Sequence, residues 1–323
     1  MSPRLSVLDR SHVWAGGHPR ESLRETVRFA QQIEELGYHR FWVAEHHGVP
    51  GVAGAAPTVL ASAVASATER IRVGTGGVML PNHRPLVVAE QFGVLGALFG
   101  DRIDVGLGRS LGFTGAVRRA LGAEDADRFW AQVSELLDYL DGTADVPAVP
   151  ADGLDLPVFV LATRTASTAA ELGLPLVIAA PLGEERMRRA IEEYRAGFRP
   201  SSRAQHPHVV IARSIAVAET TERARRLLVP EAWANAWSRT RGEFPALQPP
   251  EKILAREMTD RERTHFTRAM SGHIHGTPDE VAAAIADLEA RTGADELLVT
   301  TNAYDPADRL ESYRLLAETV VPA

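Results

Sequence analysis

Short apolar runs alternate with amphipathic helices along nearly the whole chain, and this alternation limits the folds that the chain can adopt. The first unit pairs an apolar run at Arg4–Asp9 with a segment at Glu21–Leu36, whose apolar residues recur every three or four positions before Gly37. That spacing is typical of an amphipathic helix, and a glycine directly after it is a common helix stop. Strands that alternate with helices are typical of parallel sheets with helical crossovers.

The same rhythm predicts eight strands and eight helices. The predicted strands are Arg4–Asp9, Arg40–Glu45, Ile71–Met79, Arg102–Gly108, Pro157–Ala162, Leu176–Ala180, His208–Val217 and Leu297–Thr301. The predicted helices are Glu21–Leu36, Pro57–Ala67, Pro85–Phe99, Ala166–Leu172, Glu184–Phe198 and three that begin near Glu219, Thr277 and Pro306. The last of these should have Leu310, Tyr313 and Leu316 on its apolar side. This number of units closes a (β/α)8 TIM barrel, a fold that typically takes about 250 residues plus insertions. An open Rossmann-type sheet is the alternative, but no G-x-G-x-x-G motif follows the first strand.

Residues 230–272 interrupt the rhythm. They hold aromatic residues and prolines, among them Trp233, Trp237 and Pro245, without a strand pattern. We therefore predict an insertion of helices and loop before the eighth strand, within a single domain that spans residues 1–323. The barrel resumes at Thr277-Pro-Asp-Glu280, which has the pattern of a capping box with proline at the first helical position.

Composition excludes several classes of function. The formal net charge of −7 gives no general attraction to nucleic acid or to an anionic membrane. The absence of cysteine excludes disulfides, zinc–thiolate sites and cysteine nucleophiles. No apolar run approaches the roughly 18 residues of a membrane span, and the N-terminus lacks the pattern of a signal peptide. We therefore expect a cytoplasmic protein.

Polar residues and glycines gather where four neighbouring strands are predicted to end. These segments are Glu45-His46-His47, Gly74-Thr75-Gly76-Gly77, Gly106-Leu107-Gly108-Arg109 and Leu161-Ala162-Thr163-Arg164. Active sites of such barrels lie at the carboxyl ends of the strands. We therefore expect the chemistry of this protein at these four strand ends.

Some of these features also have a purely structural interpretation. Gly74, Gly76 and Gly77 could mark a bulge or a close approach between strands, or they could let the backbone lie against a flat ligand ring. Arg109 could be a surface salt-bridge partner. Because adjacent side chains on a strand point to opposite faces, at most one of His46 and His47 should face the site, which argues against adjacent metal ligands.

Two further histidine pairs do not predict a metal site. His206 and His208 precede the seventh strand, at the opposite end of the predicted barrel, and His273 and His275 precede a helix cap. A metal-dependent barrel hydrolase would need its histidine pair at the carboxyl end of a strand. We therefore predict no metal ligands, and we expect the tryptophans of the insertion to serve packing more than substrate contact.

Long motifs of the chain resemble the luciferase-like monooxygenase family, in particular the branch that contains the mensacarcin-pathway type of oxygenase. They are LSVLDRS, GYHRFWVAEHHG, RIRVGTGGVMLPNHRPLVVAEQF, DRIDVGLGR and GADELLVTTNAYDPADRLESYRLLAE. The resemblance extends over nearly the whole chain. It implies the same barrel, with an insertion that can cover the site.

The resemblance also implies roles for individual residues. His46 would lie beside a flavin and serve as an acid or base, with Glu45 before it in the cofactor site. The step from Gly76 to Gly77 matches a dipeptide that is often joined by a non-proline cis bond, where the backbone would pack against the flavin ring. Arg109 matches a residue that contacts the flavin phosphate, and its fork of donors suits that anion.

The turn after the fifth strand departs from the family pattern, because it is shorter than the serine-rich turn of most relatives. Leu161 and Ala162 begin this predicted cofactor-binding turn. Thr163, Arg164, Thr165 and Ser167 could still hold the phosphate through hydroxyls and a helix N-terminus, and the extra arginine could compensate for the shortening. The shortening leaves two alternatives open, namely weaker flavin binding or a member that does not use flavin mononucleotide (FMN).

Overall, the resemblance implies a two-component monooxygenase. A separate reductase would supply reduced FMN, and the barrel would use it with O2 to oxygenate a small organic substrate, such as a natural product. The insertion would act as a lid that excludes water, and relatives are commonly homodimers. A deazaflavin-dependent oxidoreductase of the same fold, a non-catalytic flavin-binding homologue and a metal-dependent hydrolase remain as alternatives.

Overall fold

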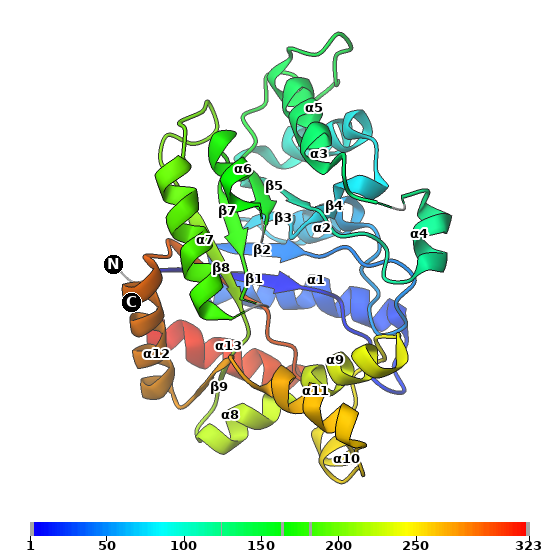
Figure 1. The fold of residues 1–323 in the computed structure, drawn as a ribbon, viewed down its shortest axis with the longest axis vertical. Coiled ribbons are helices and arrows are strands. Elements are labelled where there is room, and N and C mark those ends of the chain that lie inside the picture. Colours follow the sequence, from blue (N-terminus) through cyan, green and yellow to red (C-terminus); the bar gives the residue numbers. More distant parts are fainter. Residues whose placement is uncertain (1–2, 124, 163–164, 181–182, 321–323) are drawn as a thin grey trace. The chain divides into compact units, whose positions relative to one another are not determined.

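The computed structural model describes residues 3–123, 125–162, 165–180 and 183–320. The chain divides into two compact units (Figure 1). The first comprises Met1–His39, Val49–Ala53 and Ile211–Ala323, and the second comprises Arg40–Gly48 and Gly54–Val210. That residues 1–323 form one domain stays a prediction.

The second unit is a series of parallel strands with helices between them. Its strands are β2 (Arg40–Val43), β3 (Arg72–Thr75), β4 (Val78–Met79), β5 (Ile103–Gly108), β6 (Val158–Leu161) and β7 (Leu176–Ile178). β2 pairs with β3, β3 and β4 with β5, β5 with β6 and β6 with β7, all in parallel. Parallel strands that are covered on both faces read as continuous apolar runs, and β2 and β5 are buried at every position.

The helices of this unit connect consecutive strands. They are α2 (Pro57–Ala67), α3 (Pro85–Phe99), α4 (Gly115–Leu121), α5 (Phe129–Asp141), α6 (Ala166–Glu171) and α7 (Glu184–Gly197), with short 3-10 turns η1 (Leu80–Asn82) and η2 (Gly100–Arg102). The predicted helices Pro57–Ala67 and Pro85–Phe99 are confirmed to the residue, because proline begins each one and Gly100, at φ 67°, ends the second. The sequence analysis did not identify α4 and α5.

The predicted strand Ile71–Met79 is two strands, β3 and β4, separated by Gly76 and Gly77. The peptide bond between these two glycines is cis. A Cβ atom at Gly77 would lie 2.7 Å from the carbonyl oxygen of Gly106, and one at Gly74 would lie 2.5 Å from that of Asp104. Close approach to β5 therefore requires glycine at positions 74 and 77, as the structural interpretation expects.

The first unit contains β1 (Arg4–Asp9), β9 (Ile215–Val217), β10 (Ile274–Gly276) and β11 (Glu296–Val299), and the chain enters it along β8 (Val209–Arg213). β1 pairs in parallel with β11, and β9 pairs in parallel with β10 as a separate ribbon. The predicted strand His208–Val217 is therefore wrong as a single strand. It divides at Ser214, because Ile215–Val217 pairs with β10, a short strand that the sequence analysis missed.

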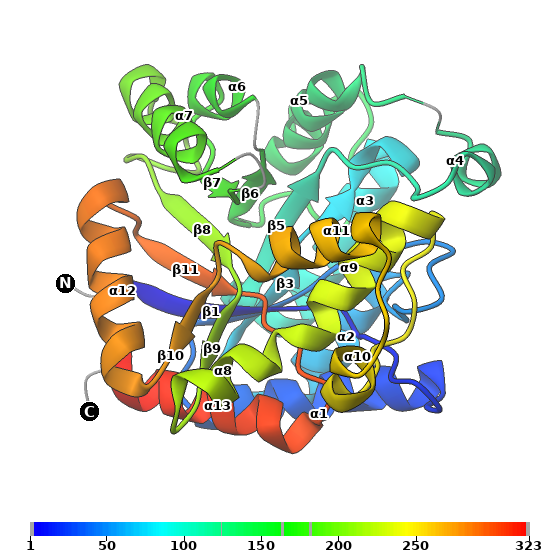
Figure 2. The same cartoon turned by 60° about the horizontal axis from the view of Figure 1, so that its bottom comes forward.

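The helices of the first unit are α1 (Pro19–Glu35), α8 (Thr221–Leu227), α9 (Val229–Arg241), α10 (Pro250–Leu254), α11 (Asp260–Met270), α12 (Pro278–Thr292) and α13 (Pro306–Val320). α9 and α11 lie side by side, and α1 lies along α13 (Figures 1 and 2). Helices α9 to α11 and their loops occupy the segment predicted as helices and loop. The capping box predicted at Thr277 and Glu280 is confirmed.

One prediction about α13 needs correction. Its buried side was expected to include Leu310, Tyr313 and Leu316, but Leu310 is only half-buried and Arg309 is buried instead. The guanidinium of Arg309 pairs with buried Asp9 and lies 3.7 Å from the ring centroid of Phe29. A buried arginine is tolerated because its charge is paired, a condition that helical periodicity does not reveal.

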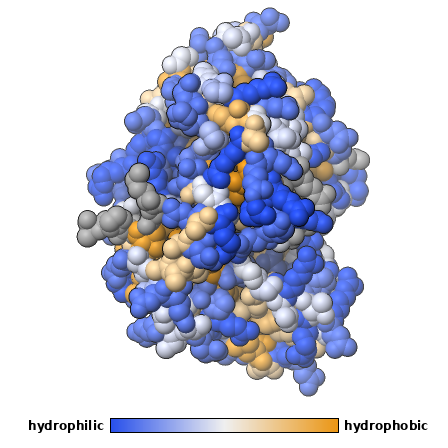
Figure 3. All heavy atoms as spheres, turned by 60° about the vertical axis from the view of Figure 1, so that its left-hand side comes forward, coloured by the Kyte–Doolittle hydropathy of each residue, from blue (hydrophilic) through white to orange (hydrophobic). Residues whose placement is uncertain are grey.

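No helix among the described residues is long and apolar enough to span a membrane. On the face drawn in Figure 3, hydrophilic side chains cover most of the surface and hydrophobic ones form small separate patches.

Candidate active site

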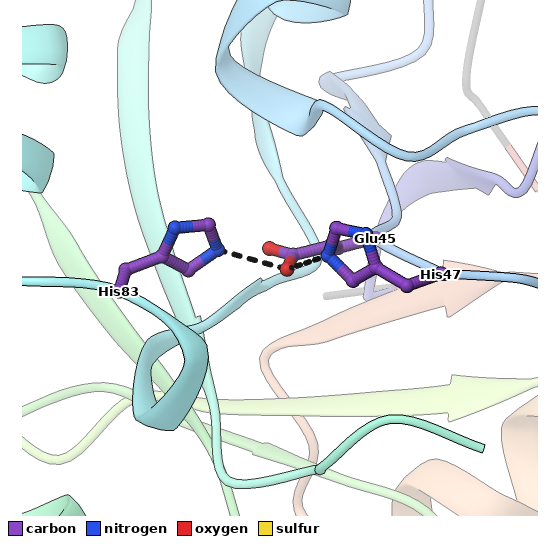
Figure 4. Close-up of side chains that lie close together, drawn as sticks. All are labelled: Glu45, His47 and His83. Atoms are coloured by element: carbon purple, nitrogen blue, oxygen red, sulfur yellow. Dashed lines mark hydrogen bonds and ion pairs between the residues drawn. The ribbon is translucent and has the colours of Figure 1, made fainter. Parts of the chain in front are cut away.

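A buried carboxylate lies just beyond the carboxyl end of β2 and holds two imidazoles. Glu45 is only 3% exposed. Its Oε1 atom lies 2.6 Å from Nε2 of His47 and 2.8 Å from Nε2 of His83, and its Oε2 atom accepts the backbone N–H of Met79 at 2.9 Å. Figure 4 shows the two imidazoles on either side of the carboxylate. Residues that follow two different strands thus meet at one charged group.

The environment of Glu45 keeps its carboxylate ionised. Burial raises the pKa of this carboxyl, but the hydrogen bond and charge of His83, the N–H of Met79 and the hydrogen bond from His47 outweigh burial and lower the pKa below its ordinary value. A carboxylate only accepts hydrogen bonds, so both Nε2 atoms must carry a proton. In the neutral state, each Nδ1 atom is then the acceptor nitrogen.

This arrangement can hold two imidazoles in fixed orientations. The side chains of His47 and His83 are 19% and 31% exposed, whereas that of Glu45 is fully buried. The carboxylate is therefore fixed inside, and each imidazole keeps an open side that can exchange protons. The ligand atoms of the three residues also lie within 4.8 Å of one another, close enough to hold a metal ion. The observed separations are those of hydrogen bonds.

In the sequence, His46 lies between Glu45 and His47, which are two of the three residues of this cluster. It is half-buried, and its backbone N–H donates to the carbonyl of Gly54 at 2.8 Å. The carboxylate of Glu45 accepts hydrogen bonds from His47, His83 and the backbone of Met79. The proton-transfer role of His46 stays a prediction.

Gly76 and Gly77 lie beside the end of β2, because the N–H of Gly76 donates to the carbonyl of Val43 at 2.9 Å. Both glycines are buried. The pair thus forms part of the backbone next to the Glu45 cluster, where the resemblance places the flavin ring.

Arg109 directly follows β5 and has a largely available guanidinium. Its side chain is 46% exposed, its Nη2 atom is 3.9 Å from Asp127, and its Nε donates to the carbonyl of Ala126 at 3.3 Å. Gly108 pairs in register with Leu161 at the end of β6, so Arg109 and Ala162 follow neighbouring strand ends.

The predicted phosphate turn is only partly described. Leu161 ends β6, and buried Ala162 donates its N–H to Val177 at 3.0 Å. Ser167 is exposed in the first turn of α6. Thr163 and Arg164 lie outside the described residues.

Sequence reasoning missed the roles of His47 and His83. Alternation along an extended segment places Glu45 and His47 on the same side, so this partner could have been predicted. His83 is 38 residues further along the chain and lies in a segment that follows the break at Gly76 and Gly77. Only the three-dimensional structure brings it to Glu45.

Comparison with known proteins decides the family. The sequence profile described as luciferase-like monooxygenase matches residues 3–296. The chain belongs to this family. It is 35% identical over 320 residues to the "Luciferase-like monooxygenase" of Escherichia coli strain K12, covering 96% of this chain and 95% of that protein. It is 32% identical to the "N-acetyl-S-alkylcysteine monooxygenase" of Bacillus subtilis, covering 99% of each chain.

The chain shares its fold with the crystal structure of apo-MsnO8, with a TM-score of 0.89 and 32% sequence identity. The match covers 99% of this chain and 100% of that one. The predicted luciferase-like (β/α)8 barrel is thereby confirmed. More distant structures share the fold alone. They include the oxygenating constituent of 3,6-diketocamphane monooxygenase in complex with FMN, at 17% identity and TM-score 0.74, and a coenzyme F420-dependent reductase from Methanopyrus kandleri, at 15% and 0.71.

Proposed function

We propose that this protein is the oxygenase component of a two-component flavin monooxygenase, which uses reduced FMN and O2 to oxygenate a small organic substrate. The observation that carries the proposal is the cluster of Glu45, His47 and His83 at the strand ends of a luciferase-like barrel. Relatives 30% or more identical over nearly the whole chain are named as monooxygenases.

The residues at the strand ends of the second unit fit a flavin phosphate and ring. Exposed Arg109 offers a forked cation for the phosphate, and Ser167 adds a hydroxyl at the start of α6. The backbone at Gly76 and Gly77 would lie against the ring. When bound, reduced FMN supplies two electrons to O2, so that one oxygen atom enters the substrate and the other leaves as water.

The protein residues handle protons and exclude solvent. His46 would hold or release a proton beside the flavin and substrate, and Glu45 would keep His47 and His83 oriented with Nε2 protonated. Residues 230–272 would exclude water. One part of that segment is fixed in place, because backbone hydrogen bonds join Leu247 to Val13 and Ala15 at 2.8 Å each.

Binding of the flavin phosphate gives the sharpest test. Purified protein is titrated anaerobically with reduced FMN and, separately, with reduced riboflavin, which lacks the phosphate. Arg109→Ala should weaken FMN binding by roughly tenfold to a hundredfold, the loss of one charge-assisted hydrogen-bonding group, and leave riboflavin binding unchanged. Arg70→Ala is the control. Arg70 is exposed just before β3, at the amino end of that strand, whereas Arg109 follows the carboxyl end of β5.

The reaction with oxygen then separates the alternatives. The FMN complex should consume O2 with a rate that differs from free reduced FMN, and His46→Ala should uncouple O2 consumption from product formation. N-acetyl-S-alkylcysteines are the first substrates to assay. Tight binding of a deazaflavin without O2 consumption would replace the proposal by hydride transfer. Stoichiometric zinc or iron in the purified protein, lost in His83→Ala, would favour the metal-dependent alternative.

We also propose that the protein forms a homodimer in the cytoplasm and receives reduced flavin from a separate reductase. Val87, Val94 and Leu98 recur along one face of α3 and are exposed, as is Val59 on neighbouring α2. Such a stripe is suited to a second copy of the chain. Leu98→Glu should yield monomers in sedimentation velocity, whereas Val146→Glu, in an exposed loop, should not.

A further inference from the structure

The first unit also places a carboxylate at the ends of its strands, that of Glu231, whose side chain is only 13% exposed. Glu231, in the first turn of α9, forms an ion pair with Arg10 and accepts Nδ2 of Asn302 at 3.1 Å. Arg10 follows β1 and Asn302 follows β11, and these strands pair in register up to Val7 and Val299. Neighbouring strand ends thus deliver their polar residues to one carboxylate, as β2 does in the second unit.

Two buried groups beside this carboxylate lack a hydrogen-bond partner among the described residues. His12, which is 5% exposed, has no partner at either ring nitrogen. The side-chain oxygen of Asn302 is equally without one. Leaving such groups unsatisfied costs about 1–3 kcal/mol each, and native structures contain few of them. Their concentration around Glu231 indicates a place where a ligand supplies the missing hydrogen bonds.

His12 cannot relieve this deficit by moving into solvent. The backbone around it is held on two sides, since Val13 donates to Gly51 at 2.9 Å and Leu247 donates to Val13 at 2.8 Å. The ring of Phe244 lies against the imidazole, with 5.5 Å between centroids. The residues that hold the backbone around His12, together with Phe244, offer no side-chain hydrogen-bond partner to the imidazole.

The charge state of the cluster defines the ligand. Burial lowers the pKa of His12 to about 4, although the charge of Glu231 acts in the opposite direction. His12 is therefore neutral near pH 7 and offers one donor and one acceptor. Arg10 and Glu231 neutralise each other, so neither an anion nor a cation gains a net attraction. Apolar surface adjoins the cluster, because Trp233 and Ala303 belong to one buried hydrophobic group.

We propose that His12 and Asn302, grouped around Glu231, form a subsite that recognises a hydroxyl group on an apolar, preferably aromatic, substrate. A phenolic hydroxyl can accept a hydrogen bond from the protonated ring nitrogen of His12 and donate its own proton to the amide oxygen of Asn302. Arg10 is a positioning residue that holds Glu231, and Glu231 orients Asn302. This inference rests on the proposed monooxygenase function, since it assigns the substrate class of that enzyme.

The test compares two probes that differ only by the hydroxyl. 4-Cresol and toluene are titrated into the complex of the protein with FMN, and binding is measured by calorimetry and by 15N resonances of the histidine rings. 4-Cresol should bind about tenfold more tightly than toluene, the equivalent of one net hydrogen bond. 4-Cresol should also shift the 15N resonance of the His12 ring, which is assigned as the one that is absent from the His12→Phe variant.

Three variants make the test decisive. His12→Phe should abolish the preference for cresol, and His12→Gln, which keeps a donor and an acceptor, should retain part of it. His206→Phe is the matched control, because His206 is exposed in the second unit. This variant should prefer 4-cresol over toluene to the same extent as the wild type. FMN binding should be unchanged in all three.

Equal binding of cresol and toluene, or a preference that survives in His12→Phe, would overturn the subsite while leaving FMN binding intact. An unshifted His12 resonance would overturn it as well, by showing that bound water satisfies the ring. Failure of the wild type to bind FMN would instead count against the proposed function.

Discussion

The two ends of the strands in the second unit both bury a carboxylate, but they use it differently. At the amino ends, Asp104 is fully buried and accepts hydrogen bonds from Arg40 at 2.7 Å, Trp42 at 3.0 Å and Arg72 at 2.7 Å. At the carboxyl ends, Glu45 is equally buried but accepts from two imidazoles that remain partly exposed.

The difference lies in the partners and not in the carboxylates. A buried charge needs compensation at either end. Permanently charged arginines provide it at Asp104, where the Arg40 side chain is itself buried. The N–H groups of two partly exposed imidazoles provide it at Glu45. This contrast agrees with the general division of such barrels into a stability face at the amino ends and a chemical face at the carboxyl ends.

The largest expected effect is at Asp104. Asp104→Ala removes the shared acceptor and leaves Arg40 buried without its partner, so the free energy of unfolding should fall by about 3–5 kcal/mol. Urea denaturation measures this. Asp101→Ala, at an exposed site, should change stability by less than about 0.5 kcal/mol. If the two variants are equally stable, the hydrogen bonds of Asp104 do not stabilise the fold, and the contrast between the two strand ends fails.

His12 provides a second contrast, because this buried imidazole has no hydrogen-bond partner among the described residues, whereas His47 and His83 bond to Glu45. The pKa of His12 is lowered from 6.5 to about 4, so the unfolded chain binds a proton that the folded protein does not between these values. Stability should therefore fall as pH decreases from 6.5 to 4, by up to about 3 kcal/mol. Unfolding free energies across this range should show a smaller slope in His12→Phe. An unchanged slope would show that His12 ionises normally in the folded protein.

A smaller effect on stability is expected at Glu45. Glu45→Gln keeps the shape but removes the charge, and it can no longer accept from both imidazoles and Met79. We expect a loss of about 1–3 kcal/mol, together with an altered rate of O2 consumption by the FMN complex. Asp104→Asn should alter stability without changing that rate. If both variants leave the rate unchanged, Glu45 is only a structural residue.

The smallest effect is the pH dependence that arises from Glu45. The pKa of this carboxyl is lowered from its ordinary value of 4.5, so its stabilising contribution is complete above that pH and is lost as pH falls through the lower, folded-state value. The stability difference between wild type and Glu45→Gln should be constant from pH 7 to 5 and shrink below pH 4.5. A difference that grows on acidification would contradict the assignment.

Local signals explain which parts of the fold could be predicted. Prolines and glycines fix the ends of α2 and α3, and Thr277 with Glu280 fixes the start of α12. Errors arose where pairing between distant segments decided the structure. The strand predicted to end at Val217 divides because β10, more than fifty residues later, pairs with its second half.

The candidate site shows the same limit. The sequence by itself determined the family, the barrel and the strand ends at which Glu45, Gly76 and Arg109 lie, because these depend on periodicity and on motifs of adjacent residues. Only the tertiary structure decided that His83 shares Glu45 with His47, that Arg309 is buried against Asp9, and that His12 lacks a hydrogen-bond partner among the described residues. Each of these outcomes depends on which distant charge or hydrogen-bonding group compensates burial, and a sequence pattern does not record that.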